Sequence, residues 1–284
     1  MKYFIVDAFT TQPFEGNTAG VVLLDNDFPS ERFMQQVAAE FRYSETAFVL
    51  RNGVNEYTIR YFTPHGEVDL CGHATIATFS TLYKLGIIDE GTLCINHTLA
   101  GDLQIRVGKT VMMQMAEPQV LDTTVNVERL HEIMGCSDKG CIINNSLPVQ
   151  VVTTGLPDIM MPVNSIDELN ALVPDMEALA QISQELGVTG VHAFALSDDG
   201  FTAHVRNFGP LYGITEESAT GTANAALTHY LHHNGIISAP AECRYMQGEA
   251  MNHPSIVATS LLEDNSVWVG GDSAIVAIGE IICD

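Results

Sequence analysis

The sequence predicts two α+β domains, each with antiparallel strands around a buried helix, and a cleft between them. Three observations carry this prediction. The chain repeats itself, both halves show the same order of helix, β-hairpin and second helix, and the second helix of each half is apolar on most sides. A helix that is apolar all round is a buried one. With 284 residues the chain is long enough for two such domains.

The internal repeat is visible when the chain is aligned with itself. At a shift of 146 residues, segment 47–64 matches segment 193–210 with six identities. At a shift of 149, segment 72–88 matches segment 221–237 with seven identities in 17 positions. The loop between the two matches is therefore three residues longer in the second half. We interpret the chain as a diverged duplication.

Each half is expected to begin with an amphipathic helix that leads into a β-hairpin. Apolar residues recur at helical spacing in 30–41 and in 175–186. The alternating segments that follow turn at Asn52-Gly53 in the first half and at Asp199-Gly200 in the second. Such dipeptides between alternating strands are typical of tight hairpin turns.

The buried helices are expected over about 74–85 and 223–233. Gly86 and Gly235 follow them, and glycine is the usual residue for the left-handed cap that ends a helix. We place the domain boundary between the halves 1–118 and 119–284. The strand-rich C-terminal segment is able to complete either half.

Composition narrows the function. The net charge of −23 argues against nucleic acid and acidic membranes as partners, because phosphate groups demand Lys and Arg. No apolar run approaches the ~20 residues of a membrane helix, and the apolar start is too short for a signal peptide. Six scattered cysteines then favour free thiols in a reducing cytoplasm.

Cofactors and metals are not expected. The chain has neither a phosphate-binding P-loop nor a dinucleotide-binding glycine fingerprint. Cys71 and His73 lack further ligands at the spacing of a metal site. We therefore expect chemistry that needs no cofactor, or no chemistry.

Gly72 and Gly221 stand where the two buried helices begin. The first turn of a helix offers unpaired N–H groups and a partial positive charge, so it binds anions. A residue without Cβ lets a ligand approach the backbone. Two such helix starts facing one cleft would hold a small carboxylate. The alternative is that both are ordinary helix starts at surface loops.

The halves differ in two reactive side chains. In the repeat, Glu45 pairs with Val191 and His73 pairs with Thr222. A carboxylate in a partly dry cleft can move a proton as a general acid/base. Glu45 is otherwise an exposed hairpin charge or a capping group, and His73 a packed or capping histidine. Glu217, beside Glu216, is by default part of a solvated acidic pair near a helix start.

The chain resembles the phenazine-biosynthesis PhzF-like family, whose fold is shared with diaminopimelate epimerase. The resemblance runs essentially end to end. It rests on the segments DAFTTQPFEGNTAGVV, SETAFV, RYFTPHGEVDLCGHAT, HTLAGDL, GITEESATGTANAAL and VWVGGDSAIVAIGEI. It implies two similar domains, each a curled, mostly antiparallel sheet around a central helix, with the active site between them. It also implies a homodimer that needs no metal or organic cofactor.

In the best understood type of member, a glutamate moves a proton across the ring of dihydro-hydroxyanthranilate. That glutamate matches Glu45, and the family's histidine matches His73. An aspartate of the family falls where this chain has Glu217, and the proline that usually follows it falls at Ser218. The longer side chain puts the anthranilate-type substrate in question, because a misplacement of ~1 Å can cost 10²-fold in rate. The family places the loop that holds Asn17 at the cleft.

The related epimerase works with two cysteines on opposite faces of its substrate. Cys71 stands where one of them would, and its counterpart is Ala219 or Thr220. A two-thiol mechanism is therefore excluded, whereas one base can still return a proton to the same face or to another carbon.

The sequence thus predicts a cofactor-independent isomerase of a small carboxylate. Glu45 is the expected general acid/base, and His73 and Glu217 are expected to bind or polarise the substrate. The further substrate-binding candidates are Asn17, Gly72, Ala74, Gly221 and Thr222. Two alternatives stay open: a one-base amino-acid epimerase or lyase, and a non-catalytic protein that binds a small molecule.

Overall fold

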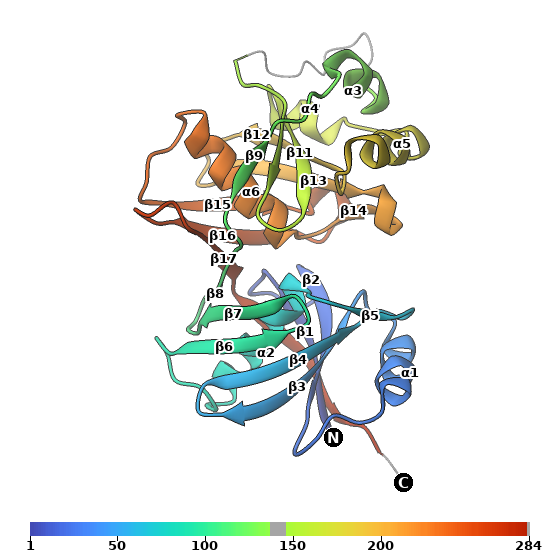
Figure 1. Ribbon diagram of the computed structural model, residues 1–284, viewed down its shortest axis with the longest axis vertical. Helices are drawn as coiled ribbons and strands as arrows, with labels where there is room; N and C mark the ends of the chain where they lie inside the picture. The colour runs from blue at the N-terminus through green and yellow to red at the C-terminus, as the bar shows by residue number, and fades with distance from the viewer. Residues whose placement is uncertain (137–145, 283–284) are drawn as a thin grey trace. The chain divides into compact units, whose positions relative to one another are not determined.

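The computed structural model describes residues 1–136 and 146–282 (Figure 1). These divide into two compact units. The first unit comprises residues 1–114 and 270–284, and the second comprises residues 115–269. The C-terminal strand belongs to the first unit, because it pairs with the first strand of the chain.

The first unit is one mostly antiparallel sheet. Its strands lie side by side in the order β18, β1, β2, β3, β4, β6, β7, β8, and the short β5 pairs with β4. Only the pairs β2–β3 and β4–β6 among these are parallel. The bounds are β1 Lys2–Ala8, β2 Asn17–Leu23, β3 Thr46–Gly53, β4 Glu56–Phe62, β5 Glu67–Val68, β6 Leu93–Thr98, β7 Gly101–Arg106, β8 Val111–Gln114 and β18 Ser273–Glu280.

The second unit repeats this order. Its strands run β9, β10, β11, β12, β13, β15, β16, with β14 paired to β13. The parallel pairs β11–β12 and β13–β15 are again the third and fifth neighbouring pairs of the order. The predicted duplication is therefore present in the pairing pattern. The bounds are β9 Gln119–Leu121, β10 Gln150–Thr153, β11 Pro157–Val163, β12 Val191–Leu196, β13 Ala203–Gly209, β14 Ile214–Glu217, β15 Ala241–Gln247 and β16 Ser255–Leu261. Strand β17 (Val267–Gly271) contains the boundary between the two units.

A buried helix lies at the centre of each unit, as predicted: α2 (Gly72–Lys84) in the first and α6 (Gly221–His233) in the second. Figure 1 shows α2 among the strands of its unit, where it contacts β1, β2, β3, β8 and β18. Every residue of α2 from His73 to Leu82 is buried. Small residues predominate, which allows strands to surround the helix closely. Gly86 (φ +67°) and Gly235 (φ +73°) follow the helices in the left-handed conformation, which confirms the predicted caps.

The remaining helices cover the outer face of each sheet. Helix α1 (Glu31–Phe41) packs Met34 and Val37 against Phe48 and Phe62 of the first sheet. In the second unit the same role falls to α3 Val127–Ile133, α4 Ile166–Asn170 and α5 Met176–Leu186. The described residues also contain two 3-10 turns, η1 Pro210–Tyr212 and η2 Glu249–Met251. Both faces of each sheet are therefore covered, and β3 begins with four consecutive buried residues.

The first hairpin differs from its prediction. Strand β3 runs through the predicted turn to Gly53, and the turn consists of Val54 and Asn55 (φ +60°). The side chain of Asn52 is used within the sheet instead, where its Nδ2 donates to Thr58 Oγ1 at 2.6 Å. In the second hairpin Gly200 (φ +104°) lies in the turn as predicted.

The four cysteines of the described residues are free thiols and are buried, as the sequence analysis expected: Cys71, Cys94, Cys136 and Cys243. In the same part of the chain, no helix has both the length and the apolar character that crossing a membrane requires.

Candidate active site

The start of helix α2 brings the two predicted catalytic groups of the first half together. Glu45 precedes strand β3, and its carbonyl accepts a hydrogen bond from Gly20 N at 3.1 Å, which fixes the backbone beside β2. His73 is the second residue of α2. The carboxylate Oε2 of Glu45 lies 3.4 Å from His73 Nε2. The His73 side chain is 6% exposed and that of Glu45 is 20% exposed, so the pair is sheltered but reachable from solvent.

Cys71 and Ser44 complete the surroundings of the imidazole. Cys71 Sγ lies 3.3 Å from Nδ1, and Ser44 Oγ lies 3.2 Å from Nε2. Burial lowers the pKa of His73, and the nearby Glu45 carboxylate opposes part of this effect. The ring is therefore neutral at neutral pH and carries one N–H. A consistent arrangement has Nε2–H pointing at Glu45 while Nδ1 accepts the Cys71 thiol proton.

Helix α2 also presents free backbone donors. Its N-terminus has no side-chain cap, and the first N–H to bond within the helix region is that of Thr75, to Cys71 O at 3.1 Å. Among the described residues, no protein acceptor lies within hydrogen-bonding distance of the N–H groups of Gly72, His73 and Ala74. Three unpaired donors at the positive end of a helix can hold a carboxylate. Ala74 is 0% exposed over the whole residue, backbone included, whereas Gly72 is half-buried.

Asn17 begins strand β2, opposite Ala8 of β1. The loop before it is held by Asp7, a buried carboxylate that accepts hydrogen bonds from Phe14 N at 2.7 Å and Thr18 Oγ1 at 2.5 Å. Gly16 in this loop has φ +74°, and a Cβ there would lie 2.2 Å from Ala8 O, so the loop needs glycine at this position.

In the second half Glu217 ends strand β14, just before helix α6. Its Oε2 accepts a hydrogen bond from Thr220 Oγ1 at 2.6 Å. Gln247 holds the same loop: its Nε2 donates to Glu217 O at 2.8 Å, and its Oε1 accepts from Thr220 N at 3.1 Å. As in α2, no acceptor for the N–H groups of Gly221 and Thr222 lies in the described part of the chain.

A buried acid lies near Glu217. The pKa of Asp158, on strand β11, is raised to about 7, mainly by burial and also by the nearby Glu217 carboxylate, while a hydrogen bond from Asn207 opposes both effects. Asn207 pairs with Glu217 across the sheet, and its Nδ2 lies 3.2 Å from His192 Nδ1. Burial lowers the pKa of His192 to about 3. At neutral pH this histidine is uncharged.

Sequence reasoning missed the roles of Ser44, Gln247 and Asp158. Ser44 is the neighbour of the predicted catalytic Glu45 in the sequence, and this adjacency could have identified it as a site residue. Gln247 lies 30 residues after Glu217, with no motif around it. Asp158 is an acid in the strand segment 157–163, which is otherwise apolar, and an acid at a buried strand position is itself the signal.

The structure also adds a donor to the Cys71–His73 pair. Ligand atoms of Glu45, Cys71 and His73 all lie within 4.8 Å of one another. Among the described residues, this is the one place where at least three such donors come together. The sequence argument against a metal considered only the local spacing of Cys71 and His73. Glu45 lies 26 positions before Cys71, and the fold brings its carboxylate close to Cys71 and His73.

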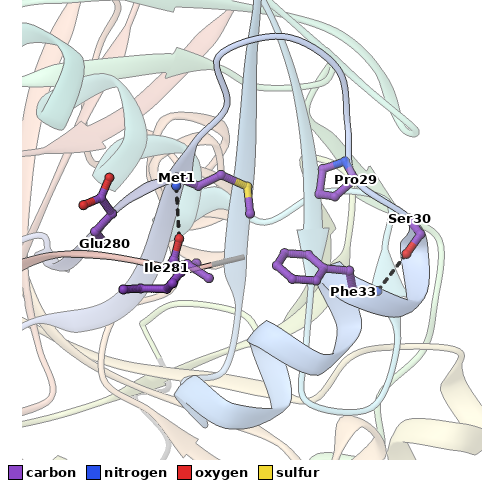
Figure 2. Close-up of a pocket in the computed structure, with 7 residues that line it drawn as sticks. Met1, Pro29, Ser30, Phe33, Glu280 and Ile281 are labelled. Carbon is purple, nitrogen blue, oxygen red and sulfur yellow. Dashed lines mark hydrogen bonds between the residues drawn. The ribbon is translucent and has the colours of Figure 1, made fainter. Parts of the chain in front are cut away.

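A cavity of about 710 Å³ lies elsewhere in the first unit, beside the N-terminus and the start of α1 (Figure 2). Two of its polar groups are paired: Met1 N donates to Ile281 O at 3.2 Å, and Ser30 Oγ accepts from Phe33 N at 3.3 Å. None of the predicted site residues lines it. We do not assign the chemistry to this cavity.

Fold and sequence together define the class of protein. A solved structure of a hydroxyproline epimerase from Agrobacterium vitis shares the fold, with a TM-score of 0.62 and 14% identity, covering 99% of this chain and 90% of that one. A phenazine biosynthesis protein of the PhzF family from Bacillus anthracis is much more similar, with a TM-score of 0.89 and 29% identity over 100% of this chain and 99% of that chain.

The chain belongs to the PhzC-PhzF family of phenazine biosynthesis-like proteins, whose model matches residues 6–279. It is 33% identical to the "Uncharacterized isomerase YddE" of Escherichia coli (strain K12), over 96% of both chains. It is 30% identical to the trans-2,3-dihydro-3-hydroxyanthranilate isomerase of Pseudomonas fluorescens, over 90% of this chain and 88% of the relative. The predicted family and fold are confirmed, and the chain is an enzyme of the isomerase class.

Proposed function

We propose that this protein is a cofactor-independent isomerase that moves a proton within a small carboxylate, with Glu45 as its single general acid/base. The observation that carries the proposal is the 3.4 Å approach of the Glu45 carboxylate to Nε2 of the buried His73, at a partly open helix start. A sheltered carboxylate beside a neutral hydrogen-bond donor is suited to accept a proton from carbon and to give it back.

The proposed mechanism uses the groups around the α2 start in sequence. The substrate carboxylate binds the N–H groups of Gly72, His73 and Ala74. Glu45 removes a proton from one carbon, and the electron pair moves along the adjacent double bond. Glu45 then returns the proton to a second carbon. Once Glu45 holds the proton it no longer needs the Nε2–H of His73, and His73 donates that N–H to the group on which negative charge develops.

The substrate class is proposed from a relative. The Pseudomonas fluorescens relative is named as an isomerase of trans-2,3-dihydro-3-hydroxyanthranilate. We propose a cyclic, unsaturated amino or hydroxy carboxylate for this chain also. Glu217 and the N–H groups of Gly221 and Thr222 are its proposed further binding groups, and Asn17 a lesser one. Glu217 stands where the family's aspartate is expected, so the preferred ring substituents differ from those of the anthranilate type.

We further propose that the protein works as a homodimer in the reducing cytoplasm. The free thiols of the described cysteines are consistent with that compartment. Light scattering during size-exclusion chromatography measures the molar mass: about twice the 30.8 kDa of one chain supports the dimer, and the single-chain mass contradicts it.

The experiment that tests the function follows the proton. The protein is incubated in D₂O with trans-2,3-dihydro-3-hydroxyanthranilate and a panel of cyclic and amino-acid carboxylates, and deuterium is located by NMR. The wild type is expected to place deuterium at a ring or allylic carbon. Glu45→Gln is expected to lose at least 10²-fold in exchange rate. Glu56→Gln, which replaces an exposed glutamate of strand β4, serves as the matched control and keeps the rate.

The other outcomes decide between the alternatives. Exchange confined to an α-carbon would replace the isomerase by a one-base epimerase or a lyase. Saturable binding of a panel member with no exchange in the folded protein, unchanged by Glu45→Gln, would indicate a non-catalytic binder. Exchange that survives Glu45→Gln would remove Glu45 from the proposed role.

A further inference from the structure

Three side chains at the start of helix α2 form a set of mixed metal donors. Glu45 contributes a carboxylate oxygen, Cys71 a sulfur and His73 a ring nitrogen, all within 4.8 Å of one another. His73 Nε2 lies 3.4 Å from Glu45 Oε2 and 3.9 Å from Cys71 Sγ. The donors come from two segments that the fold brings together, the residue before β3 and the first residues of α2.

These separations are close to those that zinc imposes. Zn²⁺ binds sulfur, nitrogen and carboxylate oxygen at about 2.0–2.3 Å with tetrahedral geometry. The corners of such a tetrahedron are about 3.3–3.8 Å apart. The carboxylate–imidazole distance of 3.4 Å falls in this range, and the distance of 3.9 Å from Cys71 Sγ to His73 Nε2 lies just above it. The donor set of one sulfur, one nitrogen and one oxygen also matches the preferences of zinc better than those of magnesium or calcium.

The surroundings favour a cation. Cys71 and His73 are 7% and 6% exposed, so these donors are held in place by packing rather than moving freely in solvent. The Glu45 side chain is 20% exposed and leaves the site open on one side. The net charge of −23 attracts cations to the protein generally. Three protein donors with an open fourth position are the arrangement of a reactive zinc site rather than a closed structural one.

We propose that Glu45, Cys71 and His73 bind one zinc ion, and that bound zinc inhibits the enzyme. Binding releases one proton in total: Cys71 coordinates as the thiolate, His73 binds through Nε2 and carries its hydrogen on Nδ1 instead, and the carboxylate of Glu45 is occupied. The inhibition rests on the proposed function, because it follows only if Glu45 must be free to accept a proton. The binding itself does not depend on that function.

The second half serves as an internal control. Its residues at the repeat positions of Glu45, Cys71 and His73 are Val191, Thr220 and Thr222. Valine offers no ligand and threonine is a poor one, so the start of helix α6 cannot form the same site. One zinc ion per chain is therefore expected, not two.

The test measures metal binding directly, on the full chain in its reduced and metal-free form. Co²⁺ replaces zinc as a probe, because a cysteine sulfur bound to Co²⁺ gives a charge-transfer band and tetrahedral Co²⁺ gives intense visible bands. We expect one equivalent of Co²⁺ to produce both, and Zn²⁺ to abolish both. Cys71→Ala and His73→Ala should each weaken binding at least tenfold, and Cys71→Ala should remove the charge-transfer band.

Cys94→Ala is the matched variant, since Cys94 is a buried free thiol of the same unit, in strand β6. It should keep both the band and the affinity. Circular dichroism confirms that each variant is folded. Absence of a charge-transfer band in the wild type, or its persistence in Cys71→Ala, overturns the site. Equal loss in Cys94→Ala also overturns it.

The exchange experiment separates this proposal from the proposed function. Exchange that depends on Glu45 but is unaffected by bound zinc contradicts the inhibition. Zinc binding by a protein that shows no exchange contradicts the proposed function and leaves the metal site standing.

Discussion

The starts of helices α2 and α6 occupy repeated positions in the two halves, yet they carry different side chains. Around α2 the reactive groups are Glu45, Cys71 and His73, within 4.8 Å of one another. At the repeat positions around α6 stand a valine and two threonines, and the acid of that half, Glu217, comes from the end of β14 instead. The backbone donors of the helix start are common to both halves. The difference shows that the duplication kept the uncapped helix start with its unpaired backbone donors twice, and the set of Glu45, Cys71 and His73 only once.

A second pair of repeated residues supports the loops before these helices. Arg60 binds Glu67 through two hydrogen bonds of 2.6 and 2.5 Å, and Arg206 binds Glu216 through two of 2.8 Å. Arg60 and Arg206 are equivalent at the shift of 146, and the two glutamates at the shift of 149. Each pair ties the loop strand that precedes the central helix to the main sheet. The ion pair is therefore part of the shared frame, unlike the reactive side chains.

The largest expected effect is on the free energy of unfolding, when one of these two repeated ion pairs is removed. Arg206→Ala should lower the free energy of unfolding by about 3 kcal/mol, because it leaves the mostly buried Glu216 without a partner. Arg206 Nη1 also donates to the carbonyls of Leu169 and Leu172. Arg60→Ala should cost only about 1–2 kcal/mol, since the Arg60 side chain is 25% exposed and solvent screens its pair. Urea denaturation measures both, and equal losses would contradict this ranking of the two halves.

The second prediction replaces His73 by threonine, the residue that stands at the equivalent position of the second half, Thr222. His73→Thr removes the N–H that we place next to Glu45, and it should lower the isotope-exchange rate about 10- to 100-fold, because a hydrogen bond to a charged group contributes about 1.5–3 kcal/mol. Thr222→Val, which alters the repeat position in the second half, should change the rate less than threefold, since only the Thr222 backbone is assigned a role. A larger effect of Thr222→Val would place side-chain chemistry at α6.

Much of the fold was accessible from the sequence. The buried helices followed from small and apolar residues on most sides, and the duplication from identities such as Arg60 with Arg206. The position of the first hairpin turn could not be predicted from the sequence. Asn52-Gly53 is a typical dipeptide of a tight hairpin turn, but in the structure Asn55 takes the left-handed conformation of the turn. The pairing of β3 with β4, in which Gly53 lies opposite Glu56, overrides this local preference.

The candidate site was accessible only in part. Glu45 and His73 were identified by their absence from the second half, and the structure places them 3.4 Å apart. The convergence of Glu45 on Cys71 was beyond any spacing rule, because it depends on how β3 packs beside the start of α2. Gln247, which orders the Glu217 loop, offered no local pattern at all. Contacts between segments that are distant in the chain cannot be predicted from a single sequence.

The buried acid of the second half gives the third prediction, on the pH dependence of stability. The folded protein holds the Asp158 pKa at about 7, against an ordinary value near 3.8. Between these values the folded state keeps a proton that the unfolded state has lost, so the free energy of unfolding falls as the pH rises from about 4 to 7. His192 acts in the opposite direction. Its pKa of about 3 in the folded protein, against 6.5, means that stability rises with pH up to about 6.5.

Asp158→Asn separates these two contributions. The variant keeps the shape of the side chain and cannot ionise, so it should be more stable than the wild type by about 1–3 kcal/mol at pH 8. The opposing slope of His192 should then appear alone, as a free energy of unfolding that increases between pH 4 and 6.5. Urea denaturation at several pH values measures this, with the exposed Asp198→Asn as control. Parallel pH profiles of the variant and the wild type would show that Asp158 is ionised in the folded protein. The buried acid would then share the second half's negative charge with Glu217 instead of leaving Glu217 as the charged group near the start of helix α6.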